Sequence, residues 1–271
     1  LKYGFLRSPY SDAETSAINH IEKIATAGGL NCHADAVANL IVETPGLYDE
    51  WIETGSHIDT VPGGGNYDGT AGVVAGIEAL LAIVQSSVAL KRGLRLRIWR
   101  GEESATFGVT SIGSRAAFGQ LDPSALQQRY NGQNLADAMH QQRAYPEMIR
   151  SHRVTITQSQ IDAITAYIEL HIEQGKVLEC SAKDIGIVTS IRGSKRSWIT
   201  ISGTFDHSGA TPMGARFRHD ANLAMAHIMV KLDQLLEQTN SDGANLVQTC
   251  GLINPPDQST NTPALLDNAI T

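Results

Sequence analysis

Residues 54–70 gather three possible metal ligands on irregular, glycine-rich backbone. His57, Asp59 and Asp68 lie there, between an apolar run that ends at Ile52 and a helix-like run over residues 72–84. Side chains on a loop between two rigid elements have the arrangement that a metal site needs. The chain must therefore fold so that a strand and a helix meet at this loop.

The residue types in this stretch favour a divalent ion of borderline softness, such as zinc or manganese, over calcium or copper. In the His57-x-Asp59 pattern, we expect the imidazole to bind metal. Asp59 would accept a hydrogen bond from the other ring nitrogen or elsewhere around the site. Asp68 has two oxygens and could bridge to a second ion. The alternative is a polar loop in which the glycines supply positive φ and Asp68 caps the following helix.

The flanking segments follow an α/β order. Apolar residues at helical spacing predict a helix over residues 12–27, which Gly28 and Gly29 end. Strand-like segments follow at residues 30–42, 52–56 and 94–99. The last of these alternates with period two, which predicts a strand with one buried face. We therefore expect an α/β catalytic domain built on a mixed sheet.

Two further polar clusters stand directly after strand-like segments. Glu102 and Glu103 follow the strand at residues 94–99, and His171 follows an apolar segment at residues 166–170. Ligands of open α/β sheets bind outside the carboxyl ends of the strands. We expect one glutamate to bind metal while its neighbour, pointing the other way from extended backbone, faces a water. The alternative for the glutamates is an acidic pair at a helix start, and for His171 a structural role.

The later part of the chain has a different residue pattern. Residues 120–150 read as helical, residues 187–191 and 198–202 as β-branched strands, and residues 219–236 as a helix. At 271 residues the chain exceeds the usual size of a single core. We predict two domains, residues 1–188 and a smaller α+β domain over residues 189–271.

Composition excludes some classes of function. The net charge of −7 argues against general binding to nucleic acid or to anionic membranes. The longest apolar stretch, residues 73–84, is too short to span a bilayer. Cys32, Cys180 and Cys250 form no paired pattern, which favours a reduced, cytoplasmic setting. The chain opens at Leu1 rather than Met, so removal of an N-terminal segment stays open.

The motifs together resemble the M20 metallopeptidase-like family. The branch they resemble contains the N-carbamoyl-L-amino acid hydrolases, the β-ureidopropionases and the allantoate or ureidoglycolate amidohydrolases. The matching segments occur in family order at residues 55–62, 67–69, 102–103, 169–175 and 207–213. The resemblance implies hydrolysis of a linear carbamoyl or ureido amide by a metal-activated water.

The resemblance also implies roles for individual residues. His57, Asp68 and His171 would hold metal, with Asp68 bridging two divalent ions, zinc or manganese, or else cobalt or nickel. Glu103 would complete the second ion's ligands, and Glu102 would be the general base. His171 marks the amidohydrolase branch, because related peptidases tend to carry Asp there.

The second domain of the family acts as a lid and a dimerisation surface. By resemblance, His207 would donate to the oxyanion, and we expect a homodimer. Contacts to the substrate carboxylate would come from Gln174, Asn261 and Arg216. The segment after Pro212 is longer than the family pattern, so Arg218 stays an alternative to Arg216. The surroundings of Asn261 also depart from the usual spacing.

Family members continue beyond the equivalent of Thr271 with a further His ligand and a substrate-binding Arg, so we expect that this chain is part of a longer protein. Two alternatives stay open. An M20 aminoacylase or dipeptidase would share the metal centre, although His171 argues against it. A metal-binding but inactive fragment could serve in dimerisation, although the intact Glu102 argues against a decayed enzyme.

Overall fold

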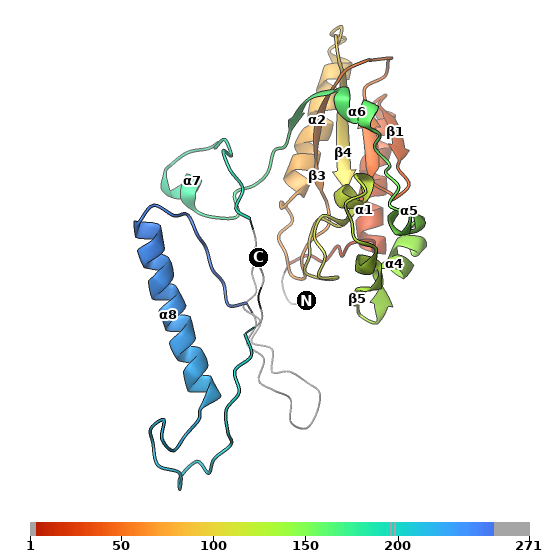
Figure 1. Cartoon of the computed structure of the whole chain (residues 1–271). Coiled ribbons are helices and arrows are strands. Elements are labelled where there is room, and N and C mark those ends of the chain that lie inside the picture. The colour runs from red at the N-terminus through yellow and green to blue at the C-terminus, as the bar shows by residue number, and fades with distance from the viewer. Residues whose placement is uncertain (1–3, 194, 196, 198, 252–271) are drawn as a thin grey trace. The chain divides into compact units, whose positions relative to one another are not determined.

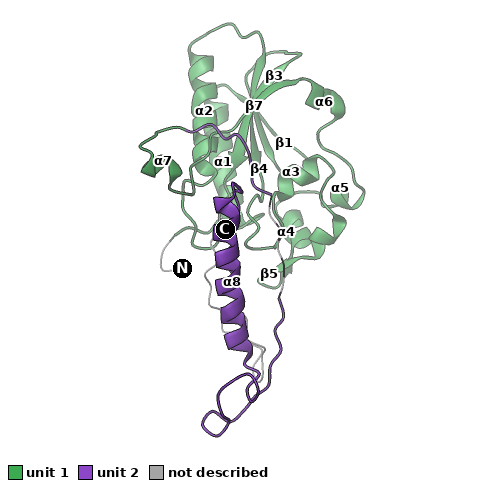
Figure 2. Cartoon of the chain, turned by 60° about the vertical axis from the view of Figure 1, so that its left-hand side comes forward, with its two compact units in different colours: residues 1–185 green, residues 186–271 purple. Residues whose placement is uncertain are grey.

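The computed structural model describes residues 4–251 except residues 194, 196 and 198. Within them the chain divides into two compact units, Leu1–Ile185 and Gly186–Thr271, coloured separately in Figure 2. The first unit carries the sheet and most of the elements in Figure 1. The two units are described separately below.

A five-stranded mixed sheet forms the centre of the first unit, with strand order β1-β2-β4-β3-β7. β1 pairs antiparallel with β2, and β2 antiparallel with β4, whereas β4, β3 and β7 run parallel. The strands are β1 (Asn31–Ala34), β2 (Leu40–Glu43), β3 (Trp51–His57), β4 (Gly93–Trp99) and β7 (Ile164–Ile168). The predicted mixed α/β fold is confirmed, and the strand-like run over residues 30–42 is two short strands rather than one.

Two helices cover one face of this sheet. α1 (Asp12–Ala27) begins at Ser11, whose side chain accepts a hydrogen bond from the Glu14 main-chain N–H, and it ends at Gly28. α2 (Thr70–Gln85) packs against β3 and β4. Apolar side chains from both helices join those of β2 and β4 in one buried cluster. The helix predicted over residues 12–27 is confirmed with the same bounds.

The other face of β4 differs from the prediction. Period-two alternation predicted one buried face for this strand, yet Arg95 and Arg97 on its other face are buried as well. Each guanidinium forms an ion pair with the buried Glu53 of β3, and Arg95 also pairs with Glu43. Because β4 lies between β2 and β3, cross-strand ion pairs satisfy these charges where water would otherwise do so.

Residues 101–163 form short elements around a second buried cluster. They comprise α3 (Ile112–Ala117), a 3₁₀ helix (Pro123–Gln127), β5 (Arg129–Tyr130), β6 (Gln133–Asn134), α4 (Leu135–Gln141), α5 (Glu147–Arg150) and α6 (Gln158–Asp162). The continuous helical region predicted over residues 120–150 is therefore wrong. A 3₁₀ turn that begins at Pro123, and a tight hairpin at Asn131 and Gly132, interrupt it.

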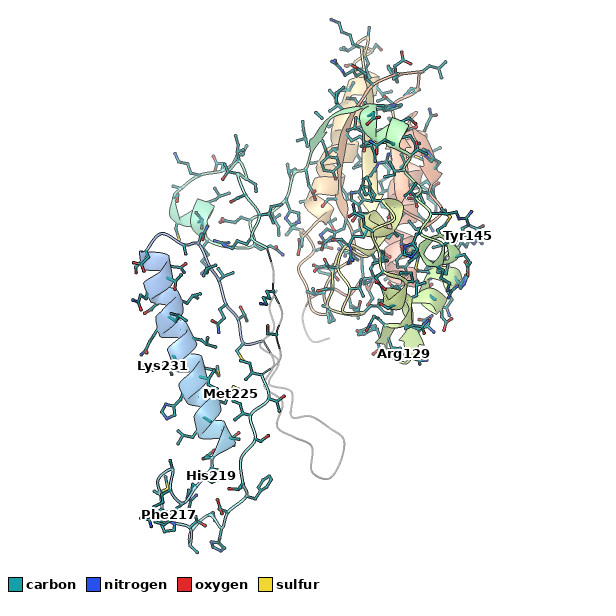
Figure 3. All side chains as sticks on the ribbon, viewed as in Figure 1. Arg129, Tyr145, Phe217, His219, Met225 and Lys231 are labelled. Carbon is teal, nitrogen blue, oxygen red and sulfur yellow. The ribbon has the colours of Figure 1, made fainter. Side chains whose placement is uncertain are left out.

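The last helix of the first unit is α7 (Val177–Cys180), and the second unit contains α8 (Ala221–Ser241). α8 starts with Asp220 as its cap, so a helix is confirmed near the predicted residues 219–236, although it runs on to Ser241. Figure 3 shows its side chains, Met225 and Lys231 among them. No residue of α8 is buried. Among the described residues, no helix has the length and apolarity needed to cross a membrane.

The strands predicted over residues 187–191 and 198–202 are not found in the described part of the second unit; residue 198 lies outside it. The side chains of Ile187 and Ile191 are each 90% exposed. A pair of strands is stable only when further strands or a helix cover its apolar face. The β-branched pattern alone was therefore insufficient to predict strands here.

Candidate active site

The carboxyl ends of three parallel strands meet at one edge of the sheet and carry the predicted ligands. His57 is the last residue of β3. Glu102 and Glu103 follow the end of β4 at Trp99, and His171 follows the end of β7 at Ile168. Three neighbouring parallel strands thus deliver imidazoles and carboxylates to the position where α/β sheets bind ligands.

His57 is almost completely buried, with 3% of its surface exposed. Its Nδ1 lies 3.1 Å from the main-chain oxygen of Asp59 and 3.4 Å from that residue's Oδ1. Nε2 faces the carboxylates, 3.8 Å from Asp68 Oδ1 and 4.0 Å from Glu102 Oε2. Partners on Nδ1 fix the ring so that Nε2 points at the site.

The charges around His57 determine its protonation. Burial lowers the pKa of this imidazole, but the hydrogen bond and charge of Asp59, together with the charges of Glu102 and Asp68, raise it to about 9. In the metal-free protein, His57 is therefore protonated at neutral pH.

Gly69 allows the loop to pass directly beside this ring. Its φ is +61°, and a Cβ atom placed on it would lie 2.4 Å from Cδ2 and Nε2 of His57. Any side chain at this position would occupy the space of the imidazole. Gly69 is also the cap residue of α2, which has no side-chain capping bond. Asp68 therefore does not cap the helix, and the capping interpretation of Asp68 is wrong.

Asp68 lies between the two histidines. Its Oδ1 is 3.2 Å from Nε2 of His171 and 3.8 Å from Nε2 of His57, and the two imidazole centroids are 6.0 Å apart. The other oxygen, Oδ2, accepts a hydrogen bond of 2.7 Å from Gln174 Nε2. His171 is held at Nδ1, 3.0 Å from the Ile172 main-chain oxygen. Both imidazoles thus present Nε2 to one carboxylate.

Asp59 holds the loop that carries the two glutamates. Its Oδ1 accepts the Glu102 main-chain N–H at 3.0 Å, and its Oδ2 accepts the Glu103 N–H at 2.9 Å. Asp59 is completely buried. Both carboxylates of the pair reach His57, although we expected them to point in opposite directions. That expectation assumed extended backbone, in which successive N–H groups point to opposite sides, whereas the N–H groups of Glu102 and Glu103 both donate to the Asp59 carboxylate.

The environment raises the pKa of both glutamates. Burial raises the pKa of Glu103 to about 7, with the negative charges of Asp68 and Glu102 adding to the effect. Burial also raises the pKa of Glu102, against the opposing charge of His57. No helix begins at these residues, since α3 starts at Ile112. The interpretation of the pair as a helix start is therefore wrong.

Two groups of side chains have the composition and spacing of a metal site. One is His57, Asp68 and His171; the other is His57, Glu102 and Glu103. Within each group, one ligand atom from every residue lies within 4.8 Å of the others. Imidazole nitrogen with carboxylate oxygen is the donor set of zinc and manganese sites. The residues present fit a divalent ion.

The remaining predicted site residues lie in the second unit or outside the described residues. His207 Nδ1 accepts the main-chain N–H groups of Gly209 and Ala210 at 3.1 and 3.0 Å. The ring proton is therefore on Nε2, which leaves that nitrogen a donor. The Arg216 guanidinium lies over the Phe217 ring. Asn261 lies outside the described residues.

Arg218, the alternative to Arg216, binds main-chain oxygens in its own unit. Its Nη2 donates to the carbonyl oxygens of Ser208 and Thr211 at 2.8 and 2.6 Å. These bonds give Arg218 a local structural role close to His207.

Two buried residues that support the glutamate loop, Glu14 and Arg100, were not predicted from the sequence. Glu14 of α1 accepts the Gly101 main-chain N–H at 3.0 Å and pairs with the Arg100 guanidinium at 2.6 Å. Glu14 lies on the same helical stripe as Ile18, Ile21 and Ala25, all buried. A charged residue on an apolar stripe was the signal that would have found it.

Comparison with known proteins gives the same assignment as the motifs. Residues 29–253 match the peptidase family M20/M25/M40. The chain is 34% identical over 241 residues to N-carbamoyl-L-amino acid amidohydrolase of Geobacillus stearothermophilus, covering 88% of this chain and 57% of that protein. It is 36% identical over 230 residues to allantoate amidohydrolase of Bacillus subtilis, covering 83% of this chain and 53% of that protein.

A solved structure shows the same fold. The hydantoinase/carbamoylase family amidase from Burkholderia ambifaria matches with a TM-score of 0.67 and 28% identity, covering 87% of this chain and 56% of that one. The chain spans about half the length of the curated relatives it matches. The match over residues 29–253 and the identity to both amidohydrolases lead to one conclusion: this chain belongs to the peptidase family M20/M25/M40.

Proposed function

We propose that the protein of which this chain is part hydrolyses the C–N bond of linear carbamoyl or ureido amides. The observation that carries the proposal is the cluster of His57, Asp68 and His171 with Glu102 and Glu103 at three adjacent strand ends. The relatives named N-carbamoyl-L-amino acid amidohydrolase and allantoate amidohydrolase support the substrate class. The substrate is a small molecule, and no nucleic acid or membrane takes part.

We assign two divalent ions to the site, zinc or manganese, with cobalt or nickel as alternatives. His57, Asp68 and His171 would hold one, and Asp68 with Glu103 would contribute to the second. Bound divalent ions supply Lewis acidity, which lowers the pKa of a water and polarises a carbonyl group. The carboxyl ends of the strands fix where that chemistry occurs.

Glu102 is the general base of this proposal. Its side chain is 42% exposed, so water reaches it, and Oε2 lies 4.0 Å from His57 Nε2. Burial raises its pKa above the ordinary value of a glutamate, which makes the carboxylate a stronger base. Glu102 accepts a proton from the attacking water and returns it to the leaving nitrogen. The main-chain bond from Glu102 to Asp59 keeps the carboxylate in place during both steps.

His207 would donate from Nε2 to the oxyanion that forms as water attacks. Its Nδ1 accepts two main-chain N–H groups, which keeps the donor on the opposite side of the ring. A donor of this type contributes about 3 kcal/mol to lowering the barrier. In this proposal residues 189–271 act as a lid and dimerisation surface. Gln174, Asn261 and Arg216 bind the substrate carboxylate.

Turnover by the full-length protein tests the assignment of the base. Glu102→Gln should lower kcat by about 10²–10⁴-fold while the protein still binds zinc, because the amide cannot accept a proton. Glu78→Gln, an exposed change on α2, is the matched control and should turn over normally. Near-normal turnover by zinc-loaded Glu102→Gln would show that another group is the base.

A substrate panel separates the proposed activity from the alternatives. Protein reloaded with zinc, manganese, cobalt or nickel should hydrolyse N-carbamoyl amino acids, allantoate or ureidoglycolate in preference to N-acyl amino acids and dipeptides. Preference for the last two would identify an aminoacylase or dipeptidase. Turnover of none of them by metal-loaded protein would favour an inactive homologue.

A further inference from the structure

The N-terminal segment runs alongside the loop that joins β3 to α2. The main-chain N–H of Phe5 donates to Gly64 at 2.9 Å, and Gly63 donates back to Phe5 at 3.1 Å. Further along, Thr60 N–H donates to the Arg7 oxygen at 3.0 Å, and Arg7 N–H donates to Thr60 Oγ1 at 2.9 Å. These bonds anchor Arg7 against the loop.

The Arg7 guanidinium reaches two points on this loop and the first residue of α2. Nε donates to the Ile58 main-chain oxygen at 2.7 Å, Nη1 to Asn66 Oδ1 at 2.7 Å, and Nη2 to Thr70 Oγ1 at 3.1 Å. One planar group with donors in fixed directions therefore joins the start and the middle of the loop to the first residue of α2. A lysine ammonium, as a single point charge, lacks this fixed geometry.

The two outer contacts lie next to the proposed ligands. Ile58 directly follows His57, and Thr70 lies two residues beyond Asp68. No helix or regular strand occurs between them, and residues 63–65 are all glycine. Glycine-rich backbone does not by itself set the separation of its ends. Cross-links such as those of Arg7 must set it.

We propose that Arg7 is a positioning residue that sets the separation of His57 and Asp68 for metal binding. The inference rests on the proposed metal site. Arg7 touches neither ligand, so its effect passes through the main chain at Ile58 and through the first turn of α2 at Thr70. Groups around a metal site that orient its ligands typically contribute 10–100-fold to metal affinity.

Zinc affinity of the full-length protein, measured by competition with a chromophoric chelator, tests this role. Arg7→Met keeps the aliphatic length and removes the donors, so it should weaken zinc binding about 10–100-fold. Arg7→Lys should fall between Arg7→Met and the original protein. Arg92→Met removes an exposed arginine that pairs with Glu50 at 2.6 Å, and it should change affinity less than twofold.

A double-mutant cycle separates positioning from a general effect on folding. Thr70→Val removes one acceptor at nearly constant shape and should weaken zinc binding several-fold. In the Arg7→Met background the same change should add nothing, because the bond is already absent. If Arg7→Met fails to fold, Thr70→Val alone decides: an unchanged zinc affinity overturns the inference.

The outcomes distinguish this inference from the proposed function. If the original protein binds no zinc, the metal site itself is refuted. If it binds zinc and Arg7→Met stays within twofold, only the role of Arg7 is refuted. Additive effects of Arg7→Met and Thr70→Val would also overturn it.

Discussion

Replacing Glu14 by Gln should destabilise the first unit more than any exposed ion-pair change. Glu14 has no exposed surface. Its Oε2 accepts the Tyr10 main-chain N–H at 2.6 Å and Arg100 Nε at 2.8 Å, while Oε1 accepts the Gly101 N–H at 3.0 Å. Both carboxylate oxygens of Glu14 therefore accept at least one hydrogen bond.

A glutamine cannot satisfy this set of donors. Whichever way its amide turns, the NH₂ group faces either the Gly101 N–H or the Arg100 guanidinium, and the buried positive charge loses its partner. Removing one member of a buried ion pair typically costs about 3–5 kcal/mol. The surrounding Tyr10 ring, 4.7 Å from the guanidinium carbon, offers Arg100 only a weaker interaction.

Urea-induced unfolding of the metal-free protein, followed by circular dichroism, measures this loss. Glu50→Gln is the matched control, because Glu50 pairs with Arg92 at 2.6 Å but is 49% exposed. An exposed pair of this kind contributes less than about 1 kcal/mol. Equal, small losses for both variants would refute the reasoning that Glu14 compensates a buried charge beneath the glutamate loop.

Two further outcomes follow from the site geometry. With the pKa of His57 raised to about 9 and that of Glu103 to about 7, both hold protons at pH 7 that a metal must displace. Zinc binding should therefore release more protons at pH 7 than at pH 9. Calorimetry in two buffers of different ionisation enthalpy measures this, and equal release at both pH values would contradict the shifts. Gly72→Ala should weaken zinc binding about tenfold, because its Cβ would lie 2.2 Å from the carbonyl oxygen preceding His171. The Cβ atom added by Gly76→Ala would contact only side-chain atoms, so this change should leave zinc affinity unchanged. An equal loss of zinc affinity in both variants would contradict the argument.

Local patterns predicted the elements that their own residues determine. The helix at Asp12–Ala27 follows from its apolar spacing and its terminal glycines, and both bounds were predicted. The strand at Gly93–Trp99 was predicted to within one residue, but not the burial of both its faces. Burial depends on neighbouring strands, which local periodicity does not reveal.

The arrangement of the ligand residues followed from topology rather than from spacing in the sequence. His57 and His171 are far apart along the chain, yet placing each after a strand was sufficient to expect them at one edge of the sheet. The supporting contacts were beyond such reasoning. Glu14 reaches Gly101, and Arg7 reaches Thr70, across long stretches of chain that carry no common motif. Only the folded structure brings these pairs together.

Two buried carboxylates hold the loop that carries Glu102 and Glu103. Glu14 and Asp59 together accept three successive main-chain N–H groups, those of residues 101, 102 and 103. These hydrogen bonds fix the main chain of the loop, and the side chains of Glu102 and Glu103 are left to face His57. This arrangement adds negative charge to a region that Asp68 already makes negative. In the metal-free protein, protons on His57 and Glu103 reduce that charge, as the raised pKa values of both groups show. A divalent ion would do the same, so protons and metal compete for one excess of negative charge, and metal affinity should rise with pH up to about 9.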